Sequence, residues 1–260
     1  MRVGIIGMGH VGHNVQHRLR RSGVETVTYD IADKLPYPEE ALSACAFVVV
    51  SVGTPSAPDG AADISDVVEA VKRIPCDRVV LRSTVPPGTT DELVAATGKS
   101  ICFSPEYVGE TTFASNSWDA WAHDQSFQII GGEPEARRWF LATLTSIEGA
   151  STRFFECTAV EAEIIKYMEN CYLATKVTFV NEFYELCEKA GANWFAVREG
   201  WLLDPRVERD HTAVFPDDRG FSGRCLPKDV DAFLYFAERL GLPMPLMAAV
   251  RSANEHYKRG

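Results

Sequence analysis

The sequence predicts an α/β protein with a doubly wound parallel sheet, followed by an all-helical domain built on one long helix. Short apolar runs that end in small or polar residues recur through the first half of the chain, and helix-like stretches alternate with them. The second half opens with about nine turns of helical spacing that contain no Gly or Pro. The 260 residues are enough for one full domain and a smaller one. We expect these domains to be residues 1–157 and 158–260.

The expected strands are apolar runs bounded by turn-forming residues, which is typical of buried parallel strands. These runs are RVGIIG, TVTYD, FVVVSV, RVVLRST, SICFSP and SFQIIGG. Apolar residues recur at helical spacing in the segments between and after them. The expected helices are residues 12–21, 64–72, 134–146, 158–190, 193–203, 229–240 and 245–257, with a loop rich in Pro, Gly, Asp and Arg over 204–227.

Composition excludes several classes of protein. The formal net charge of −10 gives no electrostatic reason to bind nucleic acid or anionic lipid. No apolar run reaches the roughly 20 residues that a membrane span needs, and the N-terminus lacks the layout of a signal peptide. The seven cysteines are odd in number and show no metal-ligand spacing, so we expect neither a disulfide framework nor a metal site. A cytoplasmic protein without nucleic-acid or membrane partners is predicted.

A glycine motif directly after the first expected strand indicates a dinucleotide site. Gly7, Gly9 and Gly12 form G-x-G-x-x-G, with Val11 inside the motif, and this pattern is typical of a Rossmann-type fold. Asp30 ends the next expected strand about 20 residues on, where a carboxylate bonds both ribose hydroxyls and repels a 2′-phosphate. We therefore expect NAD rather than NADP. The alternative is a glycine turn in an unrelated α/β fold with an incidental surface aspartate.

Polar residues follow several other expected strands. Thr54 and Thr84 lie where the carboxyl edge of an open sheet binds ligands, although each hydroxyl alone is as well explained by stabilising a turn. Glu106 and Glu110, in SPEYVGE, leave a strand end in the same way. Without other motifs they are ordinary loop carboxylates.

The segment GFSGRCLPKD, residues 220–229, is the most informative in the chain. Cys225 follows Gly223 and precedes an expected helix start, where Pro227 suits the first turn. A helix N-terminus and Lys228 lower the pKa of a thiol from about 8.5, which makes a nucleophile. The ordinary alternative is a buried cysteine that behaves as a small hydrophobe, and we assign it to the other six.

Lys166 and Asn170 are four residues apart on the long expected helix and share one face. A cation and an amide so placed can hold a developing oxyanion, whereas a solvated polar stripe is the alternative.

Six ordered motifs resemble the UDP-glucose/GDP-mannose dehydrogenase family over nearly the whole chain. They are GMGHVG, SVGTP, STVPPGTT, SPEYVGE, AEIIKYMENCYLATKVTFVNE and GFSGRCLPKD. The resemblance implies that Cys225 is the nucleophile, that Asp229 positions a water and that Lys228 contacts the cofactor. It implies that Lys166 and Asn170 bind the sugar and stabilise oxyanions, and that Glu106 is the acid/base group in thioester hydrolysis. The residues implied to face NAD are Asp30, Thr54, Thr84 and Glu110, and those implied to contact substrate also include Gly223 and Arg206, the latter across a dimer.

The reaction implied by the resemblance is an NAD-dependent four-electron oxidation of a primary alcohol of a nucleotide sugar to the carboxylate, of the UDP-glucose to UDP-glucuronate type. The family normally continues past the helix expected to end at Tyr257 into a second α/β domain that grips the nucleotide, and the sequence given stops at Gly260. The stretch from Asp30 to Val48 is shorter than usual, and Ser222 replaces a family glycine.

Three alternatives to this reaction stay open: the same mechanism on a smaller alcohol, a non-catalytic NAD-binding or assembly module, and a two-electron β-hydroxyacid dehydrogenase. The segment GFSGRCLPKD argues against the last of these.

The long expected helix carries apolar residues on more than one face, among them Ile164, Ile165, Met168, Tyr172, Phe179 and Phe183. A homodimer through residues 158–190 is predicted. The alternative is that both faces pack within one chain.

Overall fold

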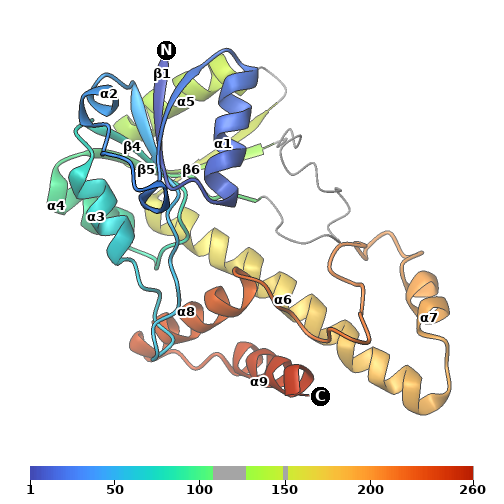
Figure 1. The fold of residues 1–260 in the computed structure, drawn as a ribbon. Coiled ribbons are helices and arrows are strands. Elements are labelled where there is room, and N and C mark those ends of the chain that lie inside the picture. Colours follow the sequence, from blue (N-terminus) through green and yellow to red (C-terminus); the bar gives the residue numbers. More distant parts are fainter. Residues whose placement is uncertain (108–126, 149–151, 260) are drawn as a thin grey trace. The chain divides into compact units, whose positions relative to one another are not determined.

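The computed structural model describes residues 1–107, 127–148 and 152–259 (Figure 1). A seven-stranded sheet has the order β2-β1-β3-β4-β5-β6-β7. All neighbouring strands are parallel except β5 and β6, which are antiparallel. The strands are β1 (Arg2–Ile6), β2 (Glu25–Tyr29), β3 (Phe47–Val50), β4 (Arg78–Leu81), β5 (Ser100–Phe103), β6 (Phe127–Gly132) and β7 (Arg153–Cys157).

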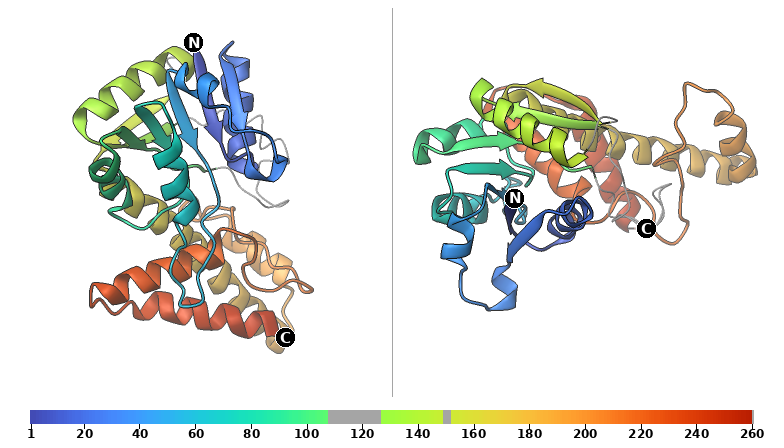
Figure 2. Two further views of the ribbon diagram at one scale, coloured as in Figure 1. Left: turned by 60° about the vertical axis from the view of Figure 1, so that its left-hand side comes forward. Right: turned by 90° about the horizontal axis from the view of Figure 1, so that it is seen from above.

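Helices cover both faces of this sheet (Figure 2). One apolar cluster joins the strands to α1 (His10–Arg21) and α5 (Pro134–Glu148). A second cluster joins the other face to α2 (Glu39–Ser43), α3 (Ser65–Arg73) and α4 (Thr89–Thr97). Because helices shield both faces, the central strand β3 is buried at every residue, which explains its unbroken apolar sequence FVVV.

The register brings three strand ends to one edge of the sheet. Ile6 at the end of β1 pairs with Tyr29 of β2 and with Val50 of β3. The glycine motif, Asp30 and the segment after β3 therefore all begin at the carboxyl edge, where open α/β sheets bind their ligands.

The second half of the chain is helical, with α6 (Ala159–Ala190), α7 (Trp194–Trp201), α8 (Leu226–Arg239) and α9 (Pro245–Arg259). The chain forms two compact units that divide at Lys166 and Tyr167 within α6, and residues 58–61 group with the second unit. An apolar cluster from α6, α8 and α9 forms the core of the second unit. Within the described residues, no helix is long and apolar enough to cross a membrane.

The predicted fold class is confirmed, with the long helix found within one residue of its expected start. The expectation of parallel strands throughout is wrong for β6, because an apolar run encodes burial but not strand direction. Strand β7 was not predicted, since its edge position leaves only Cys157 buried and removes the apolar pattern. Helix α8 begins at Leu226 rather than Asp229, because Pro227 is tolerated in a first turn.

Candidate active site

The glycine loop between β1 and α1 is shaped by a close backbone approach and a positive φ. A Cβ on Gly12 would lie 2.0 Å from the carbonyl oxygen of Gly7, and Gly7 itself has a φ of +90°. Gly9 is different, because a Cβ there would meet no atom within 4 Å, and it caps α1, which has no acidic residue in its first turn. The space beside Gly9 at this helix N-terminus fits the pyrophosphate of a dinucleotide.

Asp30 links the end of β2 to this loop. Its Oδ2 accepts a hydrogen bond from the backbone N–H of Met8 at 2.6 Å, and its Oδ1 accepts one from Ala32 at 2.9 Å. An ionised carboxylate has about four acceptor positions, so both oxygens can still accept from ribose hydroxyls. The loop and the carboxylate together fit NAD, and Asp30 also orders the loop, a role that its sequence position did not reveal.

Hydroxyl groups tie together the segments that leave the carboxyl edge. Ser51 Oγ donates to the Gly7 carbonyl at 2.9 Å, and Ser83 Oγ donates to the carbonyl of Val52 at 2.7 Å. The predicted residues of this region are all close to the edge: Thr54 is buried after β3, Thr84 is half-buried after β4, and Val11 is half-buried in the first turn of α1. Glu110 lies outside the described residues.

Glu106 belongs to a buried ion pair just beyond β5. Its Oε2 accepts from Arg82 Nη1 at 2.7 Å, and its Oε1 accepts from the N–H of Tyr107 at 2.9 Å. Arg82 also donates to Gln128 Oε1 at 3.1 Å. The two charged side chains are only 5% and 4% exposed, so this ion pair is almost completely shielded from water. Sequence reasoning missed Arg82, whose signal was a cation directly after a buried strand.

Lys166 contacts the residue that follows Glu106. Its Nζ is 4.9 Å from the centroid of the Tyr107 ring, within the range of a cation–π interaction. Two predicted catalytic residues therefore contact Tyr107, Glu106 at its backbone N–H and Lys166 at its ring.

A second group of predicted residues surrounds the start of α8. Asp229 is buried, and its Oδ2 accepts from Asn170 Nδ2 at 2.5 Å. Its Oδ1 pairs with Lys228 Nζ, also at 2.5 Å, and its N–H donates to the carbonyl of Cys225 at 3.0 Å. Cys225 is the N-cap residue of α8, as predicted. The amide of α6, the carboxylate and the ammonium group of α8 thus form one cluster one turn from the thiol-bearing residue.

The environment of Cys225 differs from that of the other cysteines. All seven lie in described residues, and Cys225 alone is half-buried whereas the rest are buried. Burial raises the pKa of Cys102 and Cys171 to about 12 and of Cys45 to about 11. Thiols with such pKa values carry almost no thiolate at neutral pH, so these three cysteines are poor nucleophiles.

Two further predicted substrate residues lie on the surface of the loop before α8. Gly223 has a φ of +84° and no atom within 4 Å of the position its Cβ would take. Arg206 is 87% exposed and forms a bidentate pair with Asp204 in the same chain.

Glu163, in the first turns of α6, is a buried carboxylate that the sequence analysis did not identify. It accepts hydrogen bonds from the N–H of Gly88 at 2.6 Å, and from the N–H and hydroxyl of Thr90 at 2.9 and 2.6 Å. It therefore caps α4 from another helix. Burial raises the pKa of this carboxyl to about 7 in spite of these donors.

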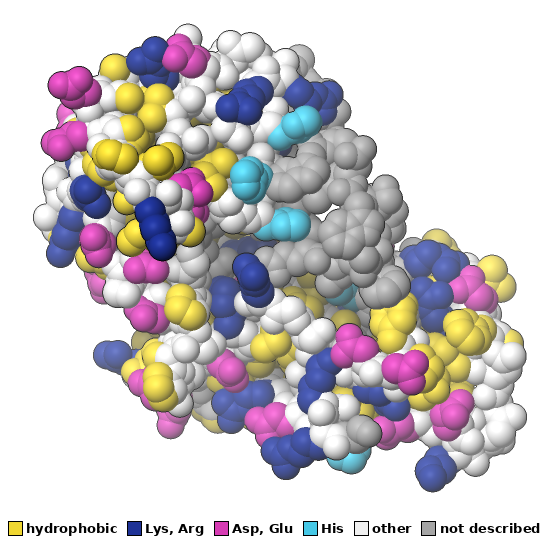
Figure 3. All heavy atoms as spheres, viewed as in Figure 1, with side chains coloured by type: hydrophobic (Ala, Val, Ile, Leu, Met, Phe, Trp, Pro, Cys, Tyr) yellow, Lys and Arg dark blue, Asp and Glu magenta, His cyan; other side chains and the backbone are white. Residues whose placement is uncertain are grey.

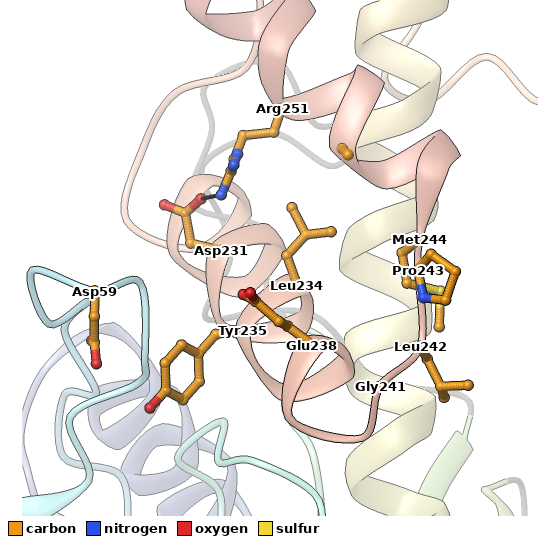
Figure 4. Close-up of a pocket in the computed structure, with 11 residues that line it drawn as sticks. Asp59, Asp231, Leu234, Tyr235, Glu238, Gly241, Leu242, Pro243, Met244 and Arg251 are labelled. Atoms are coloured by element: carbon orange, nitrogen blue, oxygen red, sulfur yellow. Dashed lines mark ion pairs between the residues drawn. The ribbon is translucent and has the colours of Figure 1, made fainter.

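A cleft of about 380 Å³ opens between α8, α9 and residues 58–61 (Figure 4). Asp231 and Arg251 face each other across one end at 3.7 Å, and Leu234 lies along its wall. None of the predicted catalytic residues lines this cleft. In the part of the chain that the structure describes, no group of His, Cys, Asp or Glu is arranged to hold a metal ion.

Comparison with known proteins gives matches along most of the chain. The NAD-binding domain of the UDP-glucose/GDP-mannose dehydrogenase family matches residues 37–139, and the central domain of the same family matches residues 160–256. A UDP-glucose 6-dehydrogenase of Rickettsia typhi (strain ATCC VR-144 / Wilmington) is 30% identical over 219 residues, which cover 80% of this chain and 49% of the relative. The chain thus spans about half the length of the curated relatives it matches.

Solved structures agree with these matches. A UDP-glucose dehydrogenase from the hyperthermophilic archaeon Pyrobaculum islandicum superposes with a TM-score of 0.83 at 28% identity, covering 98% of this chain and 68% of the other. A UDP-D-ManNAc dehydrogenase from Pyrococcus horikoshii gives a TM-score of 0.79 at 25% identity, covering 99% and 69%. The glycine loop, the buried Arg82–Glu106 ion pair and the cysteine at the start of α8 therefore lie on a fold shared with these enzymes, and the chain belongs to the UDP-glucose/GDP-mannose dehydrogenase family.

Proposed function

We propose that this chain carries out the NAD-dependent four-electron oxidation of a primary alcohol of a nucleotide sugar to the carboxylate, of the UDP-glucose to UDP-glucuronate type. The observation that carries the proposal is the state of Cys225, which is half-buried at the start of α8 and one turn from the Asn170–Asp229–Lys228 cluster. A dehydrogenase that stops at the aldehyde or ketone needs only an acid/base group, whereas oxidation to an acid is served by a nucleophile.

The first unit supplies the cofactor site. The backbone of the glycine loop and the N-terminus of α1 would hold the pyrophosphate of NAD, and Asp30 would hold the ribose. Bound NAD would supply the acceptor for each hydride that leaves the alcohol carbon, the first before the thiol adds and the second after it.

Cys225 supplies the covalent step. Its sulfur adds to the carbonyl carbon of the aldehyde while the oxygen takes up a proton, which gives a thiohemiacetal. Oxidation of that adduct leaves a thioester. Water then attacks the thioester carbon, the C–S bond breaks, and the products are the carboxylate and the restored thiol.

Charged and polar groups assist the oxygen and the water. Lys166 and Asn170 stabilise the developing oxyanions, and Asp229 positions the attacking water. Glu106 takes a proton from that water, a role for which an ionised carboxylate is required. The buried Arg82 supports this assignment because its guanidinium holds the Glu106 carboxylate in place at 2.7 Å.

We propose that the chain acts as a homodimer through α6. Apolar side chains three, four or seven residues apart along this helix are exposed: Met168 by 72%, Tyr172 by 57%, Phe179 by 45%, Phe183 by 42% and Leu186 by 59%. Figure 3 shows hydrophobic side chains gathered over α7 and the adjoining end of α6. Apolar surface of this extent is typical of protein–protein interfaces. The six buried cysteines, none of them in a disulfide, fit a reducing compartment such as the cytoplasm.

The test is the replacement of the nucleophile with a matched control. Cys225→Ser is expected to abolish formation of the second NADH from each UDP-glucose, and with it the carboxylate product. The Kd for NAD should stay unchanged, because the glycine loop and Asp30 are untouched. Cys187→Ser, which alters a buried cysteine of the second unit, is expected to retain turnover. Turnover by Cys225→Ser at the wild-type rate would contradict the proposal. Full turnover of a smaller primary alcohol, with none of UDP-glucose, would keep the mechanism and replace the substrate.

A further inference from the structure

We infer that Asn254 and Arg219 are positioning residues for the nucleophile, because they fasten the loop that carries Cys225 to helices α9 and α6. This inference rests on the proposed function of Cys225. The fastened residues are consecutive, from Arg219 to Phe221, and end four positions before the cysteine.

Asn254 holds Phe221 through both groups of its side-chain amide. The N–H of Phe221 donates to Asn254 Oδ1 at 2.7 Å, and Asn254 Nδ2 donates to the carbonyl of Phe221 at 3.1 Å. Both residues are buried, so loss of either hydrogen bond would leave a buried polar group without a partner and would cost free energy. Only an amide offers an acceptor and a donor in this arrangement, and Ala, Asp or Leu at position 254 lacks one or both.

Gly220 leaves the space that the contact between Asn254 and Phe221 needs. Its φ is +74°, and a Cβ built on it would lie 2.4 Å from Asn254 Oδ1. The backbone can therefore approach Asn254 only where a glycine precedes Phe221.

Arg219 holds the same stretch against α6. Its Nε donates to Asn181 Oδ1 at 2.5 Å, and its Nη2 donates to the Asn181 carbonyl at 2.9 Å and to Glu185 at 3.2 Å. Its guanidinium also lies over the rings of Tyr184 and Tyr257, at 4.7 and 4.9 Å from their centroids. A planar, multidentate donor is needed for this set of contacts, and lysine cannot reproduce it.

The short segment from Phe221 to Cys225 is held at both of its ends, and we call residues 219–221, with Asn254, the anchor of this segment. Phe221 packs with Val230 of α8 and Val250 of α9 in one buried cluster. Residues 222–224 are exposed and connect Phe221 to Cys225, where α8 begins. Because the link is this short, a displacement of Phe221 is transmitted to the first turn of α8 and so to the thiol.

The role is to align the thiol and not to hold NAD, since the anchoring residues all belong to the second unit. Loosening the anchor is therefore expected to slow the steps that need sulfur and to spare cofactor binding. A residue that served folding alone would change the melting temperature without changing the reactivity of the folded protein.

The experiment uses Asn254→Ala, Arg219→Lys and, as a matched control on α9, Arg251→Ala. The control removes an exposed arginine whose partner is Asp231 rather than the loop. Two rates are measured at a temperature where each protein is folded: alkylation of Cys225 by iodoacetamide, located by peptide mass mapping, and formation of the second NADH per molecule of UDP-glucose in single turnover. The six other cysteines are buried, so they react slowly in the folded protein.

We expect each anchor variant to slow both rates by about tenfold, with an unchanged Kd for NAD, and Arg251→Ala to stay within about twofold of wild type. Wild-type alkylation rates in folded Asn254→Ala and Arg219→Lys would overturn the inference. If Asn254→Ala does not fold, Arg219→Lys alone decides. If the wild type forms no NADH from any sugar nucleotide, the proposed function fails, and the alkylation rates still decide whether the anchor positions the thiol.

Discussion

The buried pair of Arg82 and Glu106 gives the sharpest prediction about stability. Arg82→Met keeps an unbranched chain of similar length but removes the guanidinium that lies 2.7 Å from the carboxylate. Glu106 is 4% exposed, so its charge would remain in the interior without the guanidinium that now faces it. Removing one member of such a pair costs about 3–5 kcal/mol, a large part of the 5–15 kcal/mol that stabilises a typical domain.

The assay is urea unfolding at pH 7, compared with two further variants. Arg82→Met/Glu106→Gln removes both charges and is expected to recover much of the loss, because no uncompensated charge stays buried. Arg2→Met breaks an ion pair with Glu25 that is 39% and 63% exposed, and is expected to cost less than about 1 kcal/mol. Equal losses for Arg82→Met and Arg2→Met would refute the reasoning, and so would a double variant less stable than Arg82→Met.

Three other predictions follow from the site and from α6. Because the pKa of Glu163 is raised from 4.5 to about 7 in the folded protein, the folded state binds more protons than the unfolded state between these values. The unfolding free energy should therefore fall by about 3 kcal/mol from pH 4.5 to pH 7 and lose this slope in Glu163→Gln, which urea titrations at several pH values would measure; equal slopes would contradict the assignment. Gly9→Ala should leave the melting temperature unchanged but weaken NAD binding, measured by calorimetry. Gly12→Ala should lower both the melting temperature and the affinity for NAD, because only the Cβ at position 12 would meet backbone, at 2.0 Å. Phe183→Glu should convert the proposed dimer to a monomer in analytical ultracentrifugation, and an unchanged sedimentation coefficient would argue against α6 as the interface.

The elements of this fold that the sequence predicted are those with a local signal. The long helix needed only helical spacing without Gly or Pro, and the buried strands needed only short apolar runs between turns. The direction of β6 and the existence of β7 depend on which strands meet in the sheet, and no short window of sequence contains that information.

The same division holds for the site. The glycine loop and the segment around Cys225 are contiguous motifs, so their residues could be named in advance. The partners that set their geometry are distant in sequence: Arg82 and Glu106 are 24 residues apart, Thr90 and Glu163 are 73 apart, and Phe221 and Asn254 are 33 apart. Nothing in the nearby sequence distinguishes these residues, because only the fold brings each one to its partner.

If Cys225 acts as proposed, four electrons leave each molecule of the nucleotide sugar. The most direct test is the number of NADH molecules formed per molecule of UDP-glucose when purified protein is mixed with excess NAD. We expect two NADH per sugar and a carboxylate product. One NADH per sugar, or none from a protein that binds NAD, would contradict a four-electron oxidation of this sugar nucleotide.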